Sequence, residues 1–386
     1  MNTLCFVKYD AQIRIYKQAK ALKNTGRYRL VLICEKCNYD LLKDVFDEII
    51  FYGFLKNKNN NFASRILNYG SNKLFGYSNK NLKKIINNIN ADIFHTHAEP
   101  NDVPRTVMEN SKVPVVFDSQ DFSGISFGLE NLDKKIKEDE KYCFEHASGI
   151  CHKGPEFEID YYRQHGYNIN APEIQWMDYC DKDLFVGVKP KKLSMEDGEI
   201  HLVHTGTISN DPKYRYKYLI PLGKKLAKQR VHLHIYPSNN YEYRTSKEYL
   251  ELDRKEKYFH FHDSVAYLKL PEEIAQYDWH SHILEYFVGP MFTPEKQRVS
   301  MGNKLFTSLE AGLPMVVSPQ LECIRKLVEK YKIGIIVKDE DLNSLKQIIE
   351  NQNYTDFQSN VLKAREKLSL DNQVPRLEKF YQIWVK

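Results

Sequence analysis

The chain has 386 residues and a formal net charge of +5, from 56 basic and 51 acidic side chains. This length predicts two to three domains. Hydrophobic residues make up 42% and charged residues 28%, which excludes wholesale disorder. No window approaches the ~18 apolar residues of a membrane span. The N-terminus lacks the apolar stretch of a signal peptide. We therefore expect a cytoplasmic protein, and so small a charge excess does not indicate a nucleic-acid partner.

Cysteine and histidine are the first residues to weigh as metal ligands. Seven cysteines are scattered along the chain, an odd number that predicts reduced thiols. The sequence also contains four H-x-H pairs, His95/His97, His232/His234, His260/His262 and His280/His282. Because positions i and i+2 share one face of a strand, each pair could suit metal ligation. Four pairs on separate strands cannot all form one site, and polar positions at strand ends explain them equally well. We expect neither a metal nor another cofactor.

In the first half, short runs rich in Val, Ile and Phe alternate with longer amphipathic runs. The apolar runs predict strands at Thr3–Val7, Arg29–Cys34, Glu48–Tyr52, Ile93–Thr96, Val113–Asp118 and Gly149–His152. The amphipathic runs predict helices, such as Ile13–Lys23 and Leu82–Asn90. This alternation indicates a doubly wound parallel sheet. A polar stretch with Gly and Pro, 187–198, is expected to link it to a second domain.

The same pattern restarts after that linker. It predicts strands at Ile200–Thr205, Val231–Tyr236, Tyr258–His262, His282–Tyr286, Met315–Ser318 and Gly334–Val337. We expect an N-terminal Rossmann-like domain over 1–190 and a C-terminal one over 199–365. Residues 366–386 are expected to form a helix that packs back on the first domain. Ligands of such sheets bind at the carboxyl ends of the strands.

Two segments of the second half suit an anionic ligand. In the run Met301–Ser318, Asn303 can cap a helix whose first turn contains Lys304. A helix N-terminus disfavours a cation, so a bound anion would account for Lys304, with a solvated surface lysine as the alternative. The run Val203–Ser209 predicts a strand that ends in a turn at Gly206, and cations that include Arg215 and Lys217 follow it.

These segments resemble the donor half of GT-B glycosyltransferases, most closely glycosyltransferase family 4 and its relatives. The resemblance rests on Gly206-Thr207 and its downstream cations, and on Asn303-Lys-Leu-Phe followed by Glu310-Ala-Gly-Leu-Pro-Met-Val-Val317. The first half agrees through Ala91-Asp-Ile-Phe-His-Thr-His97 and Val113-Pro-Val-Val-Phe-Asp-Ser-Gln-Asp121. Motifs in this order span roughly residues 1–350. The resemblance implies two Rossmann-like domains whose parallel sheets face each other across a cleft.

The resemblance also implies a role for each matching residue. The donor diphosphate would contact Gly206, Thr207, Arg215, Lys217, Asn303 and Lys304. The nucleoside would lie by His262, Val265, Thr307 and Glu310. The acceptor or transferred sugar would meet Asp10, Glu99 and Gln120, and catalysis would involve His97, Asp118 and Asp121. Thr307 stands where many members have a glutamate, and Gln120 where many have a histidine.

The implied reaction moves a hexosyl group from a nucleotide-diphosphate sugar to a glycan, lipid-linked or protein acceptor, in surface glycan or glycoconjugate assembly. Such enzymes usually need no metal, because protein cations and helix amides stabilise the departing diphosphate. The family favours retention of anomeric configuration. Inversion, which needs an enzyme base near the acceptor hydroxyl, stays open.

The charge excess is local. Residues 54–90 contain seven cations, no acid and many aromatic residues, which leaves the other 349 residues at −2. Such a segment could lie on an anionic membrane surface, and a solvated insertion is the alternative.

Three rival functions stay open: a metal-dependent hydrolase using Asp92, His95 and His97, a non-catalytic glycan- or nucleotide-binding protein, and a sugar-nucleotide epimerase.

Overall fold

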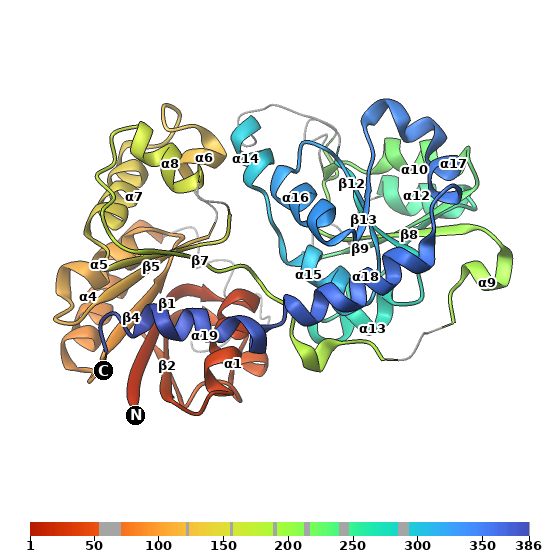
Figure 1. Cartoon of the computed structure of the whole chain (residues 1–386). Coiled ribbons are helices and arrows are strands. Elements are labelled where there is room, and N and C mark those ends of the chain that lie inside the picture. The colour runs from red at the N-terminus through yellow and green to blue at the C-terminus, as the bar shows by residue number, and fades with distance from the viewer. Residues whose placement is uncertain are drawn as a thin grey trace. The chain divides into compact units, whose positions relative to one another are not determined.

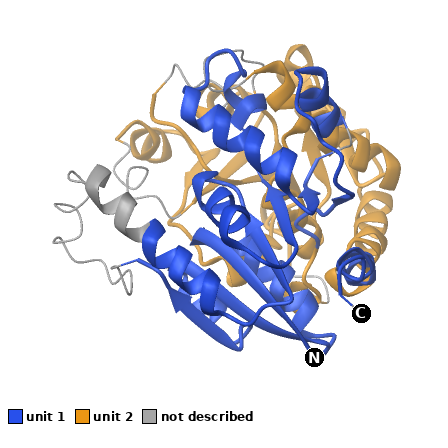
Figure 2. Ribbon diagram, turned by 90° about the vertical axis from the view of Figure 1, so that its left-hand side faces the viewer, with its two compact units in different colours: residues 1–179, 373–386 blue, residues 180–372 orange. Residues whose placement is uncertain are grey.

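The computed structural model describes residues 1–53, 71–120, 123–154, 157–187, 191–211, 217–238, 247–284 and 293–385, with 71–78 described by their backbone alone. The chain divides into two compact units (Figure 2). Unit 1 comprises Met1–Tyr179 and Gln373–Lys386, and unit 2 comprises Cys180–Asn372. The division therefore precedes the polar stretch 187–198 in which we expected the linker. That stretch belongs to unit 2, where the Leu193 amide donates to the Gln276 carbonyl at 3.0 Å.

Unit 1 contains a seven-stranded sheet in the order β3-β2-β1-β4-β5-β6-β7, with every pairing parallel (Figure 1). Its strands are β1 (Asn2–Ala11), β2 (Tyr28–Cys37), β3 (Glu48–Phe51), β4 (Ile93–His97), β5 (Val115–Ser119), β6 (Gly149–His152) and β7 (Glu173–Gln175). Its helices are α1 (Ile13–Lys23), α2 (Tyr39–Leu42), α4 (Ser71–Asn88), α5 (Asp102–Asn110), α6 (Ser123–Phe127), α7 (Lys134–His146) and α8 (Phe157–Gln164). The six strands predicted for this half are confirmed. The short strand β7, with only Ile174 buried, is an addition.

Unit 2 contains a six-stranded sheet in the order β10-β9-β8-β11-β12-β13, again with parallel pairings. Its strands are β8 (Ile200–Gly206), β9 (Val231–Pro237), β10 (Phe259–Phe261), β11 (Trp279–His282), β12 (Met315–Val317) and β13 (Gly334–Ile336). Its α-helices are α9 (Ser194–Asp197), α10 (Ile220–Ala227), α12 (Lys247–Lys255), α13 (Leu270–Ile274), α14 (Pro294–Val299), α15 (Asn303–Glu310), α16 (Glu322–Tyr331), α17 (Leu345–Glu350) and α18 (Tyr354–Lys367). Short 3₁₀ turns lie at Lys182–Leu184, Tyr267–Lys269 and Asp339–Ser344. This strand order is the Rossmann order.

One predicted strand of unit 2 is misplaced. We expected it at His282–Tyr286, whereas β11 runs from Trp279 to His282 and pairs with β8 and β12. Trp279 packs in the core against Tyr354 and Phe357. The residues after it, His280, Ser281 and His282, are all fully buried. Three polar residues in a row gave this strand no apolar signature.

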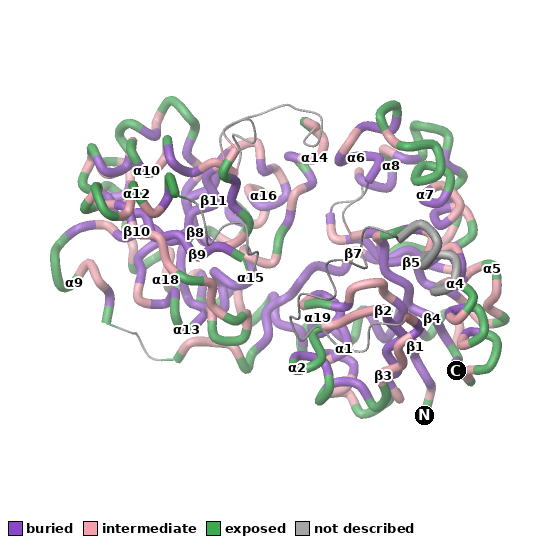
Figure 3. The backbone as a smooth tube through the Cα atoms, turned by 180° about the vertical axis from the view of Figure 1, so that it is seen from behind, coloured by how far each residue is buried: buried purple, intermediate pink, exposed green. Residues whose placement is uncertain are grey.

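The C-terminal helix α19 (Leu370–Tyr381) ends on the sheet of unit 1. Its Tyr381 lies edge-on to His95 of β4, and Phe380 and Trp384 reach Gly149 of β6 so closely that a side chain there would clash. Strands β4, β5 and β11 are buried along their length, and most of the backbone of both sheets is buried (Figure 3). Among the helices that the structure describes, none combines the length and apolar character needed to span a bilayer.

Candidate functional site

The carboxyl end of β8 in unit 2 forms an open turn. Gly206 closes the strand with φ of +110°, a conformation that glycine adopts readily, and a Cβ there would meet nothing within 4 Å. The following loop is anchored on its far side, because the Ser209 amide donates to the Lys217 carbonyl at 2.8 Å. Tyr249 fixes the same loop by donating its hydroxyl to the Ser209 carbonyl at 3.0 Å. Arg215 lies outside the described residues.

Helix α15 begins near this end of the sheet and has no side-chain cap. Its N-cap residue is Gly302, which has no side chain to offer, so the prediction that Asn303 caps the helix is wrong. The Asn303 Oδ1 is buried and finds no hydrogen-bond donor in the part of the chain that the structure describes. A helix start without a side-chain acceptor keeps its backbone amides available to an anion.

Lys304, in the first turn of α15, is a half-buried cation. Among the residues that the structure describes, no carboxylate lies within ion-pair distance of its ammonium. Burial first, and the nearby Lys217 second, lower the pKa of Lys304 to about 8. Burial and the Lys304 charge also lower the pKa of His280 to about 3, so that ring is neutral. A bound anion would relieve this unbalanced positive potential.

The residues assigned to the nucleoside lie in helix α15 and in the loop after β10. The Thr307 hydroxyl donates to the Asn303 carbonyl at 3.2 Å within the helix. Glu310 is at the far end of α15, roughly 9 Å along the axis from Lys304, and its carboxylate accepts from the Asp181 amide at 2.8 Å. His262 follows β10 and stacks on Tyr236 with ring centroids 4.4 Å apart. Val265 packs, partly buried, against an apolar cluster that also contains Tyr236 and Ala311.

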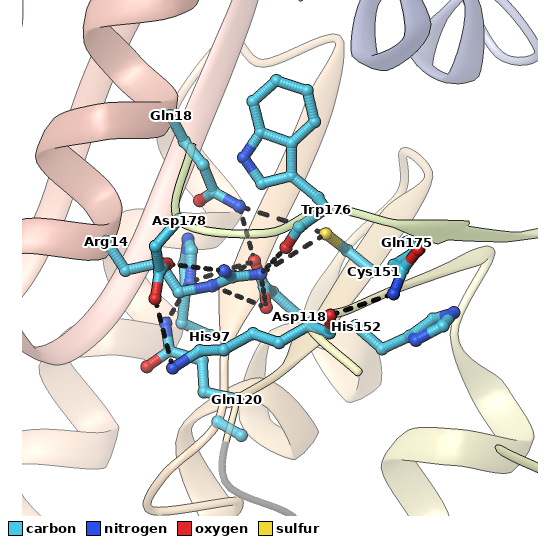
Figure 4. Close-up of polar contacts among 12 residues, drawn as sticks. Arg14, Gln18, His97, Asp118, Gln120, Cys151, His152, Gln175, Trp176 and Asp178 are labelled. Carbon is cyan, nitrogen blue, oxygen red and sulfur yellow. Dashed lines mark hydrogen bonds and ion pairs between the residues drawn. The ribbon is translucent and has the colours of Figure 1, made fainter. Parts of the chain in front are cut away.

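In unit 1, a buried ion-pair network lies at the carboxyl ends of the central strands (Figure 4). Arg14 of α1 donates to both oxygens of Asp118 on β5, at 2.9 to 3.2 Å, and to Asp178 at 2.8 Å. Gln18 adds a hydrogen bond to Asp118 at 2.6 Å. Burial acts to raise the pKa of Asp118, but the Arg14 charge and two histidines hold it well below its usual range.

This network changes the interpretation of Asp118. The sequence suggests a catalytic carboxylate, whereas the structure gives both of its oxygens to Arg14, Gln18 and His95. A fully buried carboxylate with these donors positions its neighbours and does not offer an oxygen to an acceptor hydroxyl. Asp121, the other predicted carboxylate, lies outside the described residues.

His97 ends β4 within the same network. The Gln120 side chain donates to its Nδ1 at 2.9 Å, an arrangement that places the ring proton on Nε2. That Nε2 is buried and has no hydrogen-bond partner among the residues described. Burial, only partly opposed by the Asp118 charge, holds the pKa of His97 well below its usual value. His97 is therefore a neutral hydrogen-bond donor and a weak base.

The remaining predicted acceptor residues lie near these strand ends. Glu99 accepts a hydrogen bond from the Ser123 hydroxyl. Asp10, near the end of β1, pairs with Lys36 at 3.0 Å. Lys8 donates to the Ala98 carbonyl and, at 3.5 Å, to Gln120.

The metal-dependent hydrolase is not supported by this geometry. Asp92 precedes β4 and accepts from the Thr3 amide at 2.7 Å, at the amino end of the sheet. His97 is five residues further along, roughly 16 Å away in an extended strand. His95 contacts Asp118 at 3.3 Å, a carboxylate that Arg14 already occupies. The three residues therefore do not form one site.

Sequence reasoning missed Arg14 and Gln18, and it noted Asp178 only as part of the family resemblance, without a role. The signal available was weak: Arg14 and Gln18 are four residues apart and so share one face of α1. Both are buried, as is Lys17, which donates to the Asp178 carbonyl at 2.9 Å.

Comparison with solved structures shows the same two-unit architecture. Sucrose-phosphate synthase of Thermosynechococcus elongatus superimposes with a TM-score of 0.70 at 11% identity, over 99% of this chain and 98% of that one. HepE of Anabaena, solved in complex with UDP-glucose, has a TM-score of 0.67 at 14% identity, over 98% of this chain and 100% of that one. A glycosyltransferase of Rickettsia africae has a TM-score of 0.63 at 13% identity, over 100% of this chain and 99% of that one.

The chain has the GT-B fold. No protein-family model matches the sequence, and no curated protein matches it either. At these identities the likeness establishes the fold alone, so the membership in glycosyltransferase family 4 stays a prediction.

Proposed function

We propose that this protein is a glycosyltransferase that moves a hexosyl group from a nucleotide-diphosphate sugar to an acceptor. The observation that carries the proposal is Lys304: a half-buried ammonium without an acidic partner in the described chain, in the first turn of an uncapped helix. A diphosphate supplies the missing negative charge. The GT-B fold, shared with proteins such as HepE in its UDP-glucose complex, supports the same function.

The donor site would use the chain's own cations. As the sugar bond breaks, negative charge develops on the departing diphosphate. Lys304, Lys217 and the first amides of α15 would stabilise that charge, with Gly206 allowing the phosphates close to the backbone. Arg215 is proposed as a further phosphate ligand on the sequence alone. Transfer of this kind needs no metal ion.

The chemistry of unit 1 favours retention of configuration. Inversion needs a base that takes the proton of the acceptor hydroxyl. His97 is a poor candidate because its pKa is low and its Nδ1 already accepts from Gln120. Asp118 is a poor candidate because Arg14 and Gln18 hold its oxygens. With both bases weakened, we propose a retaining transfer.

The acceptor is proposed to be a growing surface glycan or glycoconjugate on the inner face of the membrane. The described part of the basic segment fits an accessory contact: on α4, Leu82 and Ile86 are buried while Lys80, Lys83 and Lys84 are exposed. Residues 54–70 of that segment lie outside the described residues. Flotation with anionic liposomes over a salt series tests the membrane contact, and absence of binding at every salt concentration would refute it.

Donor binding is the first test of the function. Isothermal titration with UDP, GDP and ADP sugars should identify one preferred nucleotide. Lys304→Met removes a charged hydrogen bond of about 1.5 to 3 kcal/mol, so its affinity should fall about 10- to 150-fold. Lys330→Met, which removes an exposed cation from the end of α16, is the matched control and should leave affinity unchanged.

Product analysis then separates the rivals. Transfer to an acceptor, followed by NMR of the anomeric proton, identifies the enzyme and its stereochemistry. Binding without consumption of the donor would instead identify a binding protein. Conversion of the sugar while it stays on the nucleotide would identify an epimerase.

A further inference from the structure

A group of histidines covers one face of the unit 2 sheet at the amino ends of its strands. His201 is the second residue of β8, and His232 is the second residue of β9. The two are directly paired across the strands, and their rings are parallel, with centroids 4.2 Å apart. Gly206 is at the other end of β8, roughly 16 Å away. This group is therefore separate from the proposed donor site.

Asp197, the last residue of α9, faces both rings. Its Oδ2 lies 3.2 Å from His201 Nε2 and 3.4 Å from His232 Nε2. Zinc bonds of 2.0–2.1 Å in a tetrahedron place ligand atoms roughly 3.3 Å apart. Both distances from Asp197 Oδ2 match this spacing. Ligand atoms of His201, His232 and His234 also lie within 4.8 Å of one another.

Two further histidines contact the Nδ1 atoms of the His201 and His232 rings. His201 Nδ1 lies 2.9 Å from His234 Nε2, and His232 Nδ1 lies 2.8 Å from His260 Nε2. Metal-bound histidines are usually held in this way through the nitrogen that does not bind the metal. With a metal on each Nε2, each Nδ1 carries the proton and donates it to the next ring.

One nitrogen of His232 is left unused. His232 is 4% exposed, and its Nε2 makes no hydrogen bond within the described chain. The Asp197 side chain is 41% exposed and gives an ion a path from solvent.

We propose that Asp197, His201 and His232 bind a divalent transition-metal ion of the zinc class, with water at the fourth position. Two imidazoles and one carboxylate suit zinc, and also cobalt, nickel and copper. The ion joins α9 to β8 and β9 and so stabilises unit 2. It lies at the end of the strands opposite Gly206 and takes no part in sugar transfer.

The test is metal titration of the chelator-treated full-length protein. Zn²⁺ in competition with a chromophoric chelator should bind at one equivalent, and Co²⁺ should give the visible absorption of a tetrahedral site. His201→Asn and His232→Asn should each weaken binding by more than about 100-fold, and His234→Asn by about 10- to 100-fold. The controls are His146→Asn and His165→Asn, exposed histidines that each contact a backbone carbonyl, and both should bind as the wild type does.

Asp197→Asn keeps the proposal testable if a buried histidine variant fails to fold, because Asp197 is exposed. This variant should remain folded by circular dichroism and should lose the cobalt spectrum. A wild-type protein that binds less than one equivalent would overturn the proposal. So would an unchanged affinity in folded Asp197→Asn and His201→Asn. None of these measurements uses a sugar nucleotide, so they are independent of the proposed transfer.

Discussion

Arg14 provides the sharpest test of how unit 1 is held together. Its side chain is buried and is the main counter-ion of Asp118 and a counter-ion of Asp178, two carboxylates that are also buried. Arg14→Met keeps most of the apolar length of the side chain and removes the charge. Loss of one partner from a buried ion pair costs about 3–5 kcal/mol, because the charge left behind stays desolvated. We expect a loss of that size in the free energy of unfolding of unit 1.

The matched control is Arg27→Met. Arg27 pairs with Glu378 at 3.2 Å, but its side chain is 65% exposed, so its loss should cost about 0–1 kcal/mol. Urea unfolding by circular dichroism measures both variants, and hydrogen exchange of β5 peptides reports unit 1 separately. Adding Asp118→Asn to Arg14→Met should recover part of the stability, because it removes the unpaired charge. Equal costs for Arg14→Met and Arg27→Met would refute the reasoning.

Three further outcomes are expected. Gly334→Ala places a Cβ 2.2 Å from the Met315 carbonyl oxygen and should lower the free energy of unfolding by about 1–3 kcal/mol. In the control Gly187→Ala, the new Cβ meets nothing within 4 Å, so stability should not change. Equal urea midpoints for the two variants would contradict this prediction. His280, with a folded pKa of about 3 against about 6.5 unfolded, should make stability fall as pH decreases from about 6.5 toward 3, and His280→Gln should flatten that slope in urea titrations. Pyrophosphate affinity should decrease as pH rises through about 8, where Lys304 loses its proton. Arginine keeps its charge at this pH, so a Lys304→Arg protein whose affinity still decreased would exclude Lys304 as the source of the pH dependence.

The fold could be predicted because its signal is local. Alternating apolar and amphipathic runs indicated two parallel sheets, and α1 has the predicted bounds, Ile13–Lys23. Helix α15 and Lys304 were expected in their observed places, since a helix start can be read from a few adjacent residues. The β11 strand was misplaced for the same reason: His280 and His282 are buried polar residues, and a pattern of hydrophobicity does not reveal them.

What the sequence by itself determined was the order of strands and helices, and with it the strand ends where ligands bind. Only the tertiary structure decided which polar groups meet. Arg14 and Asp118 are 104 residues apart. His201 belongs to none of the H-x-H pairs, yet it lies between Asp197 and His234 in the folded chain. Contacts of this kind depend on which strands become neighbours in the sheet, and that is set by long-range packing rather than by local sequence.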